Sequence, residues 1–201
     1  VHYEVKDGVA ILTVDNPPVN PLSDGVRAGF VNNIDKAEND PDVLGVVLTG
    51  AGRSFIAGAD ISEFGKNPDG PGLDEAFKKL EFCSKPVVAA INGSALGGGL
   101  ETALVCNYRI AGPAAFVGLP EVNLGLLPGA GGTQRLPRLV GPAEALKIML
   151  TGMHVSAKKA FSMGIIDEVV AQRNLVDGGR ASHRPGIHLF EVVDPIGDQQ
   201  V

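Results

Sequence analysis

Three short segments in the first half of the chain are almost wholly apolar. They span residues 9–14, 43–49 and 87–91, are rich in β-branched residues, and end close to glycine, proline or asparagine. Runs of this length and composition are typical of strands that are buried on both faces of a parallel sheet. We therefore expect these segments to form three central strands.

The segments between these strands have the spacing of helices. Val26, Phe30 and Ile34 follow the possible N-cap Ser23 at intervals of four residues, and residues 73–83 show a similar apolar stripe. Each stripe predicts a helix with one buried face. Because strands alternate with helices, the pattern predicts an α/β fold with a largely parallel sheet.

Beyond residue 91 the predicted elements are shorter and are separated by glycines. The pattern predicts helices over 98–106, 143–150 and 157–163, and short strands over 109–111, 115–117 and 165–170. The periodicity ends near Asn174. We therefore expect one domain over residues 1–172, followed by an atypical C-terminal tail over residues 173–201.

Composition and charge narrow the class of protein. The 201 residues are 44% apolar and 20% charged, which is typical of a soluble globular domain. The net charge of −6 argues against nucleic acid as the main partner, and the absence of a long apolar run predicts no membrane span. Two cysteines are too few for a disulfide framework, which favours a reducing compartment and a cytoplasmic location.

Several common motifs are absent from the sequence. The dinucleotide-binding fingerprint fails at Phe55, and a P-loop fails at Asn67. Ser94 lacks the flanking glycines of a nucleophile elbow. The four histidines and two cysteines have no metal-ligand spacing, so we expect no metal.

The chain has 27 glycines, whereas average usage of roughly 7% predicts about 14. Two glycine-bearing turns, at residues 57–60 and 97–99, stand out. The backbone N–H groups of Ala59 and Gly98 could point at one atom and stabilise an oxyanion, because the second turn leads into a helix. The alternative is that these glycines only allow a helix to pack closely on a strand.

Two carboxylates lie in otherwise apolar stretches. Glu101 follows the second turn, and Glu121 lies in a nearly uncharged segment. Burial would raise the pKa of either carboxyl, which suits proton transfer next to a carbonyl group. The alternatives are that Glu101 only complements the helix dipole and that Glu121 is an ordinary loop carboxylate.

Residues 54–61, 86–101 and 119–136 together resemble the crotonase (enoyl-CoA hydratase/isomerase) superfamily, in an order that extends over residues 5–170. The segments 16–20 and 118–122 are most similar to the hydratase part of bifunctional enoyl-CoA hydratase/3-hydroxyacyl-CoA dehydrogenases. The resemblance implies a spiral of ββα repeats, with the usual C-terminal helical region shortened or absent.

The resemblance also implies an acyl-CoA thioester as substrate, with its carbonyl oxygen between the N–H groups of Ala59 and Gly98. Glu101 and Glu121 are the implied catalytic residues. Further substrate-binding residues implied by the family pattern are Ala57, Gly58, Asp60, Ile61 and Gly97. Coenzyme A is part of the substrate, and no separate cofactor is expected.

The implied reaction is hydration of 2-enoyl-CoA to 3-hydroxyacyl-CoA in fatty-acid β-oxidation. The alternatives are enoyl-CoA Δ3-Δ2 isomerisation or another crotonase-type reaction, and acyl-CoA binding with little turnover. RNA-binding relatives use a lysine-rich helix, whereas residues 26–37 contain only Arg27 and Lys36 as basic residues. A homotrimer or hexamer is expected if the C-terminus permits, and a mitochondrial or peroxisomal location if the source is eukaryotic.

Overall fold

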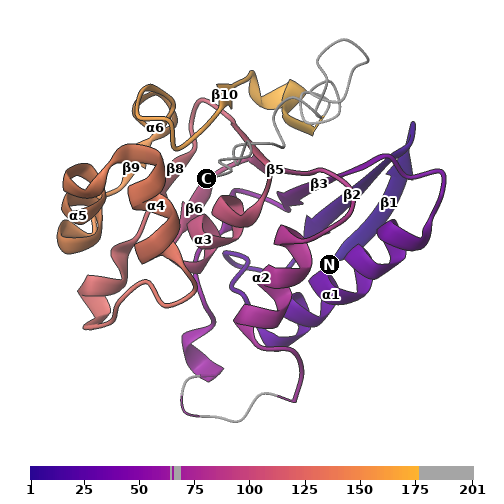
Figure 1. The fold of residues 1–201 in the computed structure, drawn as a ribbon, viewed down its shortest axis with the longest axis horizontal. Coiled ribbons are helices and arrows are strands. Elements are labelled where there is room, and N and C mark those ends of the chain that lie inside the picture. The colour runs from indigo at the N-terminus through magenta and orange to yellow at the C-terminus, as the bar shows by residue number, and fades with distance from the viewer. Residues whose placement is uncertain (64, 66–68, 177–201) are drawn as a thin grey trace, which may run out of the picture.

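The computed structural model describes residues 1–63, 65 and 69–176 (Figure 1). Most of the predicted tail, residues 177–201, lies outside this part of the chain. The larger sheet has the strand order β1-β2-β3-β5-β7-β10, and only the β1–β2 pair is antiparallel. Its strands are β1 (His2–Lys6), β2 (Val9–Val14), β3 (Gly45–Gly50), β5 (Val87–Ile91), β7 (Tyr108–Ala111) and β10 (Glu168–Val169).

The smaller sheet has the order β4-β6-β8-β9. Its strands are β4 (Ser54–Ile56), β6 (Ser94–Leu96), β8 (Phe116–Gly118) and β9 (Val155–Ser156). The first three are parallel, and β9 is antiparallel to β8. Strands of the two sheets alternate along the chain from β3 to β8, so successive turns of the chain build both sheets together.

The helices cover and connect these sheets. They are α1 (Asp24–Asn39), α2 (Leu73–Glu81), α3 (Gly98–Val105), α4 (Gly132–Val140), α5 (Pro142–Thr151) and α6 (Ala157–Ser162), with 3₁₀ turns η1 (Ile61–Glu63), η2 (Pro120–Leu124) and η3 (Gln172–Asn174). In Figure 1, α1 and α2 lie side by side next to β1–β3, whereas α4, α5 and α6 gather at the opposite end.

Alternate residues of the central strands enter two different apolar clusters. Leu12 and Leu48 join the larger cluster, where they meet Phe30 of α1 and other fully buried side chains. Val47 points to the opposite face, into a smaller cluster that also contains the buried Leu175. Both faces of the sheet are therefore covered, which explains why its strands are apolar at nearly every position.

The structure confirms the α/β class and the three predicted central strands. The predicted strand over residues 165–170 is wrong in extent, because β10 contains only Glu168–Val169. Ile165 and Ile166 are buried, but their N–H groups donate to the Ala160 carbonyl at the end of α6. The apolar run thus closes a helix before it enters the sheet.

Candidate active site

Three segments of the candidate site follow three neighbouring parallel strands of the smaller sheet. Ala57–Ala59 follows β4, Gly97 follows β6, and Glu121 lies just beyond β8. The carboxyl ends of parallel strands meet at one edge of a sheet, where neighbouring strands lie about 4.8 Å apart. A Cβ atom built on Gly97 would accordingly lie 3.2 Å from Glu121 Oε1 and 3.8 Å from Gly58 Cα.

The glycines of the second turn have distinct roles. Gly97 has a φ of +53°, a conformation that L side chains rarely adopt. A Cβ atom on Gly99 would lie 1.8 Å from the Ile56 carbonyl oxygen, so the close-packing interpretation is correct for this residue. A Cβ atom on Gly98 would lie 3.4 Å from the Ala59 nitrogen, which places the two candidate N–H donors side by side.

The peptide groups that carry these two donors are fixed by their neighbours. The Gly58 carbonyl accepts the Leu22 N–H at 2.9 Å, and the Gly97 carbonyl accepts the Glu101 N–H at 3.0 Å. Within the described chain, no backbone acceptor pairs with the Ala59 N–H, and Gly98 begins α3, where N–H groups have no acceptor inside the helix. Both N–H groups are thus available to a ligand.

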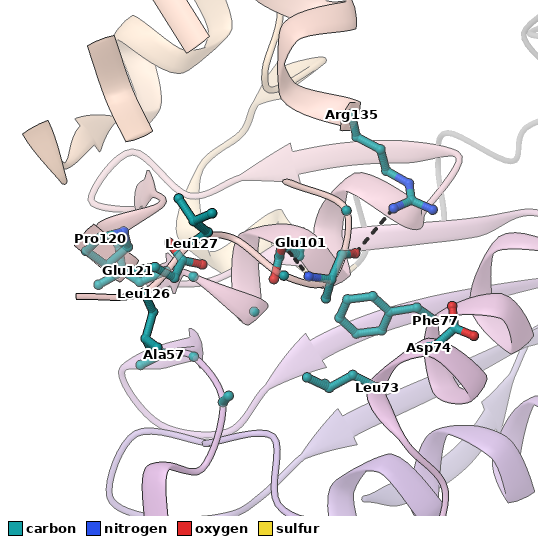
Figure 2. A pocket seen from close by; sticks show the side chains of 18 of the residues that line it. Ala57, Leu73, Asp74, Phe77, Glu101, Pro120, Glu121, Leu126, Leu127 and Arg135 are labelled. Carbon is teal, nitrogen blue, oxygen red and sulfur yellow. Dashed lines mark hydrogen bonds between the residues drawn. The ribbon is translucent and has the colours of Figure 1, made fainter. Parts of the chain in front are cut away.

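A cavity of about 810 Å³ brings the predicted residues together (Figure 2). Its wall contains the two predicted catalytic glutamates and six of the predicted binding residues, namely Ala57, Gly58, Ala59, Ile61, Gly97 and Gly98. Leu73 and Phe77 of α2 add an apolar side to it. Asp60 lies outside the lining set, and its Oδ1 accepts the Ser62 N–H at 3.0 Å at the start of η1.

Glu101 is buried, with 3% of its surface exposed, and one of its oxygens is held firmly. Oε1 accepts the Ala130 N–H at 2.9 Å, from the loop before α4, and the Gly132 N–H at 2.8 Å, from the first residue of α4. Burial raises the pKa of this carboxyl, whereas the two N–H groups and the charge of Arg135 lower it. Burial is the largest of these effects, so the pKa of Glu101 is raised on balance, and the contacts only oppose the rise.

Glu121 lies in a different environment, although both carboxyl groups line the same cavity. Its Oε2 is buried and has no hydrogen-bond partner among the described residues. Burial is the main cause that raises the pKa of Glu121 to about 7; its own backbone N–H opposes the shift, and repulsion from Glu101 adds to it. Both carboxyl groups therefore have raised pKa values, but only Glu101 has N–H donors from other residues and a nearby arginine that oppose the rise, whereas Glu121, with a pKa of about 7, is poised to carry a proton near neutral pH.

Sequence reasoning missed the contribution of Arg27, which it identified only as a basic residue on a helix. This buried arginine donates to the Leu22 carbonyl at 2.7 Å and to Glu63 Oε2 at 2.9 Å. Leu22 holds the Gly58 carbonyl, and Glu63 lies in η1, just after Ala59. Arg27 thus braces the turn that carries Ala59 from both sides. The burial of Arg27, which is unusual for an arginine, identifies this role, and that burial is visible only in the folded chain.

The described residues contain no group of three or more histidine, cysteine, aspartate or glutamate side chains that could hold a metal ion. In the same part of the chain, no helix combines the length and the apolar character that a membrane crossing requires.

Residues 4–184 match the family model described as enoyl-CoA hydratase/isomerase, and the chain belongs to this family. The peroxisomal bifunctional enzyme of Danio rerio is 53% identical over 171 residues, which cover 85% of this chain and 24% of that protein. A probable enoyl-CoA hydratase of Bacillus subtilis is 46% identical over 173 residues, which cover 83% of this chain and 67% of that protein. The predicted likeness to the hydratase part of bifunctional enzymes is thus confirmed, and the chain spans about a quarter of the bifunctional relative.

The solved structures agree with this assignment. A crystal structure from Geobacillus kaustophilus, named as subunit I of an enoyl-CoA hydratase, superposes with a TM-score of 0.83 at 39% identity. The match covers 94% of this chain and 77% of that one. The predicted crotonase-type fold is therefore confirmed for the described residues.

Proposed function

We propose that this chain hydrates 2-enoyl-CoA thioesters to 3-hydroxyacyl-CoA. The observation that carries the proposal is the pair Glu101 and Glu121, which line one cavity in unlike environments beside the N–H groups of Ala59 and Gly98. Burial raises the pKa of both carboxyl groups, but Glu101 has two N–H donors for its anion and Glu121 Oε2 has no partner among the described residues. Paired carboxyl groups in such unlike environments suit a reaction that removes one proton and delivers another. The name of the Bacillus subtilis relative, probable enoyl-CoA hydratase, supports the same chemistry.

The two N–H groups serve the thioester carbonyl in this proposal. When water attacks the β-carbon of an enoyl thioester, negative charge collects on the carbonyl oxygen as an enolate. Donation from Ala59 and Gly98 stabilises that charge most strongly at the transition state. Because the two peptide groups are already held by the N–H groups of Leu22 and Glu101, the donors need little reorganisation as the charge develops.

The glutamates handle the protons. The ionised Glu101 accepts a proton from the water while the water oxygen bonds to the β-carbon. The protonated Glu121 gives its proton to the α-carbon as the enolate collapses. One hydrogen and one hydroxyl are added across the double bond, and transfer of the proton from Glu101 to Glu121 through solvent restores the site.

A second candidate activity is isomerisation of a 3-enoyl-CoA to a 2-enoyl-CoA. The unpartnered Oε2 of Glu121 favours this activity, because one carboxyl could take a proton from the α-carbon and return it at the γ-carbon. Neither reaction needs a separate cofactor in this proposal, because coenzyme A is part of the substrate. Conversion of 3-enoyl-CoA to 2-enoyl-CoA by the Glu101→Gln variant would identify the isomerase activity.

The cellular setting is part of the proposal. Two relatives carry the names peroxisomal bifunctional enzyme and peroxisomal fatty acid beta-oxidation multifunctional protein, which favour a role in β-oxidation and a peroxisomal location if the source is eukaryotic.

We also propose that the chain self-associates as a homotrimer, alone or paired into a hexamer. Exposed leucines on η2, α5 and the loop between η2 and α4 support an interface there, namely Leu124, Leu127, Leu146 and Leu150. Sedimentation equilibrium measures the mass.

The direct test is hydration of crotonyl-CoA and of longer 2-enoyl-CoA thioesters by the unmodified chain. Glu101→Gln and Glu121→Gln should each lower the rate by about 10²–10⁴-fold, which is the usual contribution of a general acid or base. Glu144→Gln, an exposed glutamate on α5, is the matched control and should leave the rate unchanged. Full activity in both active-site variants would contradict the proposal.

A further inference from the structure

The loop that holds Glu101 is itself tied to a distant helix. Arg135, in the first turn of α4, folds back over Gly131, and a Cβ atom on that glycine would lie 1.9 Å from the arginine Nη1. Arg135 Nη1 donates to the Ala130 carbonyl at 3.3 Å, and the Ala130 N–H donates to Glu101 Oε1 at 2.9 Å. In Figure 2, one dashed line starts at the labelled Arg135 and another at the labelled Glu101.

The other edge of the guanidinium is fixed by Glu81, the last residue of α2. Nη2 donates to Glu81 Oε2 at 2.7 Å and Nε donates to Oε1 at 3.3 Å, so the pair is bidentate. A bidentate pair fixes the plane of the guanidinium as well as its position. A continuous chain of contacts therefore runs from α2 through Arg135 and the loop to the carboxylate of Glu101.

We propose that Arg135 and Glu81 are positioning residues that act as a clasp on the loop of Ala130–Gly132, and so set the orientation of Glu101 for catalysis. This inference rests on the proposed hydratase function. The clasp keeps both N–H groups on one oxygen of Glu101, which leaves the other oxygen for the water that attacks the substrate. A shift of about 1 Å in such a group can cost roughly 10²-fold in rate.

Two simpler roles for this ion pair fit the contacts less well. Arg135 lines the cavity and could bind an anionic part of the substrate, but three of its nitrogens are already engaged and Glu81 neutralises its charge. The pair could merely stabilise the fold, but both side chains are partly exposed, and exposed ion pairs contribute little to stability. Its effect should therefore appear in kcat rather than in KM.

The charged groups around Glu101 give the clasp a distinctive signature. Glu121 on η2 and Arg135 on α4 line the cavity with it, and α2 contributes Asp74, Lys78 and Glu81 to the same wall. Arg135 lowers the pKa of Glu101, so its removal should raise that pKa, whereas removal of the Glu81 charge should not. Loss of the clasp and loss of the charge can thus be separated.

The experiment compares Arg135→Met, Arg135→Lys and Glu81→Gln with the unmodified chain. Arg135→Met and Glu81→Gln should each lower kcat by about 10–10²-fold with KM within about threefold. In Arg135→Met the acidic limb of the kcat profile should also move to higher pH, and in Glu81→Gln it should not. Arg135→Lys keeps the charge but loses the bidentate geometry, so it should keep the pH profile and lose part of kcat. It also preserves the test if Arg135→Met fails to fold.

Two control variants and one measurement without substrate complete the test. Arg138→Met, one turn further along α4, and Glu75→Gln, an exposed residue of α2, should leave kcat unchanged. NMR titration of the ¹³C-labelled Glu101 carboxyl should show a higher pKa in Arg135→Met than in the unmodified chain, and this measurement needs no substrate. If the unmodified chain does not hydrate enoyl-CoA but the pKa shift is found, only the proposed function is refuted. Unchanged kcat in Arg135→Met and Glu81→Gln would overturn the clasp.

Discussion

Replacement of Glu121 by glutamine should make the protein more stable and much less active. The carboxyl has a pKa of about 7 in the folded protein, against an ordinary value of 4.5, mainly because burial penalises its charged form. Below pH 4.5 the group is neutral in the folded and unfolded states, and ionisation costs nothing. As the pH rises from 4.5 to about 7, the unfolded chain ionises first, and the folded state loses stability. Glutamine has the same shape and no charge to bury.

The size of the effect follows from the shift in pKa. Each unit corresponds to 1.36 kcal/mol, so the shift from 4.5 to about 7 sets an upper limit of about 3 kcal/mol. Glu121 is only partly buried, and solvent screening reduces the expected gain to roughly 1–2 kcal/mol. For a domain of this size the gain corresponds to a rise in Tm of roughly 3–6 °C.

Thermal unfolding by circular dichroism at pH 5 and pH 8, at one ionic strength, measures this gain. Glu121→Gln should exceed the unmodified chain in Tm at pH 8 and differ little from it at pH 5. Glu144→Gln, at an exposed position, should show no such dependence. An equal gain at both pH values, or no gain at pH 8, would refute the reasoning that the active site stores the cost of a buried charge.

Three further predictions concern the pH profile, the carbonyl site and its support. Hydration by the unmodified chain should decline above about pH 7, because Glu121 then loses the proton that it must deliver; a rate that stays flat from pH 5 to 9 would contradict this role. Gly98→Ala should lower kcat by about 10²–10³-fold, because the new methyl group would lie 2.9 Å from Leu22 Cδ1, which must shift, and would touch the Ala59 nitrogen at 3.4 Å. Gly72→Ala, with open space around it, should leave kcat unchanged, and steady-state kinetics measure both. Arg27→Met should cost about 1–3 kcal/mol in urea unfolding, because it removes the donor to the buried Leu22 carbonyl and the partner of two half-buried carboxylates, while the exposed Lys78→Met should have no measurable effect.

The central strands of the larger sheet could be predicted from the sequence, as could β8 of the smaller sheet, but β1, β4 and β6 could not. Strands β2, β3 and β5 are buried on both faces, so their apolar runs identify them. Strands β4 and β6 have three residues each, too few for any periodicity, and they exist because they pair with each other and with β8. A pattern within one segment carries no information about such pairing.

The candidate site shows the same division. The apolar surroundings of Glu101 and Glu121 identified both carboxyl groups as candidates, and both line the cavity. The partners of Glu101, by contrast, are backbone N–H groups 29 and 31 residues further along the chain. Backbone donors have no signature in side-chain chemistry, so only the folded loop could identify them. The catalytic roles of Glu101 and Glu121 are predictions, and the glutamine variants described above test them.

The arrangement of three turns along one edge of the smaller sheet separates two tasks physically. The turns after β4 and β6 present backbone N–H groups, which no substitution of a side chain removes directly, whereas the segment after β8 presents a carboxyl that a single substitution replaces. In the proposed function, a side-chain substitution can therefore obstruct the donors to the thioester carbonyl, as Gly98→Ala would, but cannot remove them, whereas the carboxyl beside the neighbouring carbons is easily exchanged. Such a scaffold can acquire a new reaction without first having to rebuild its hold on the substrate.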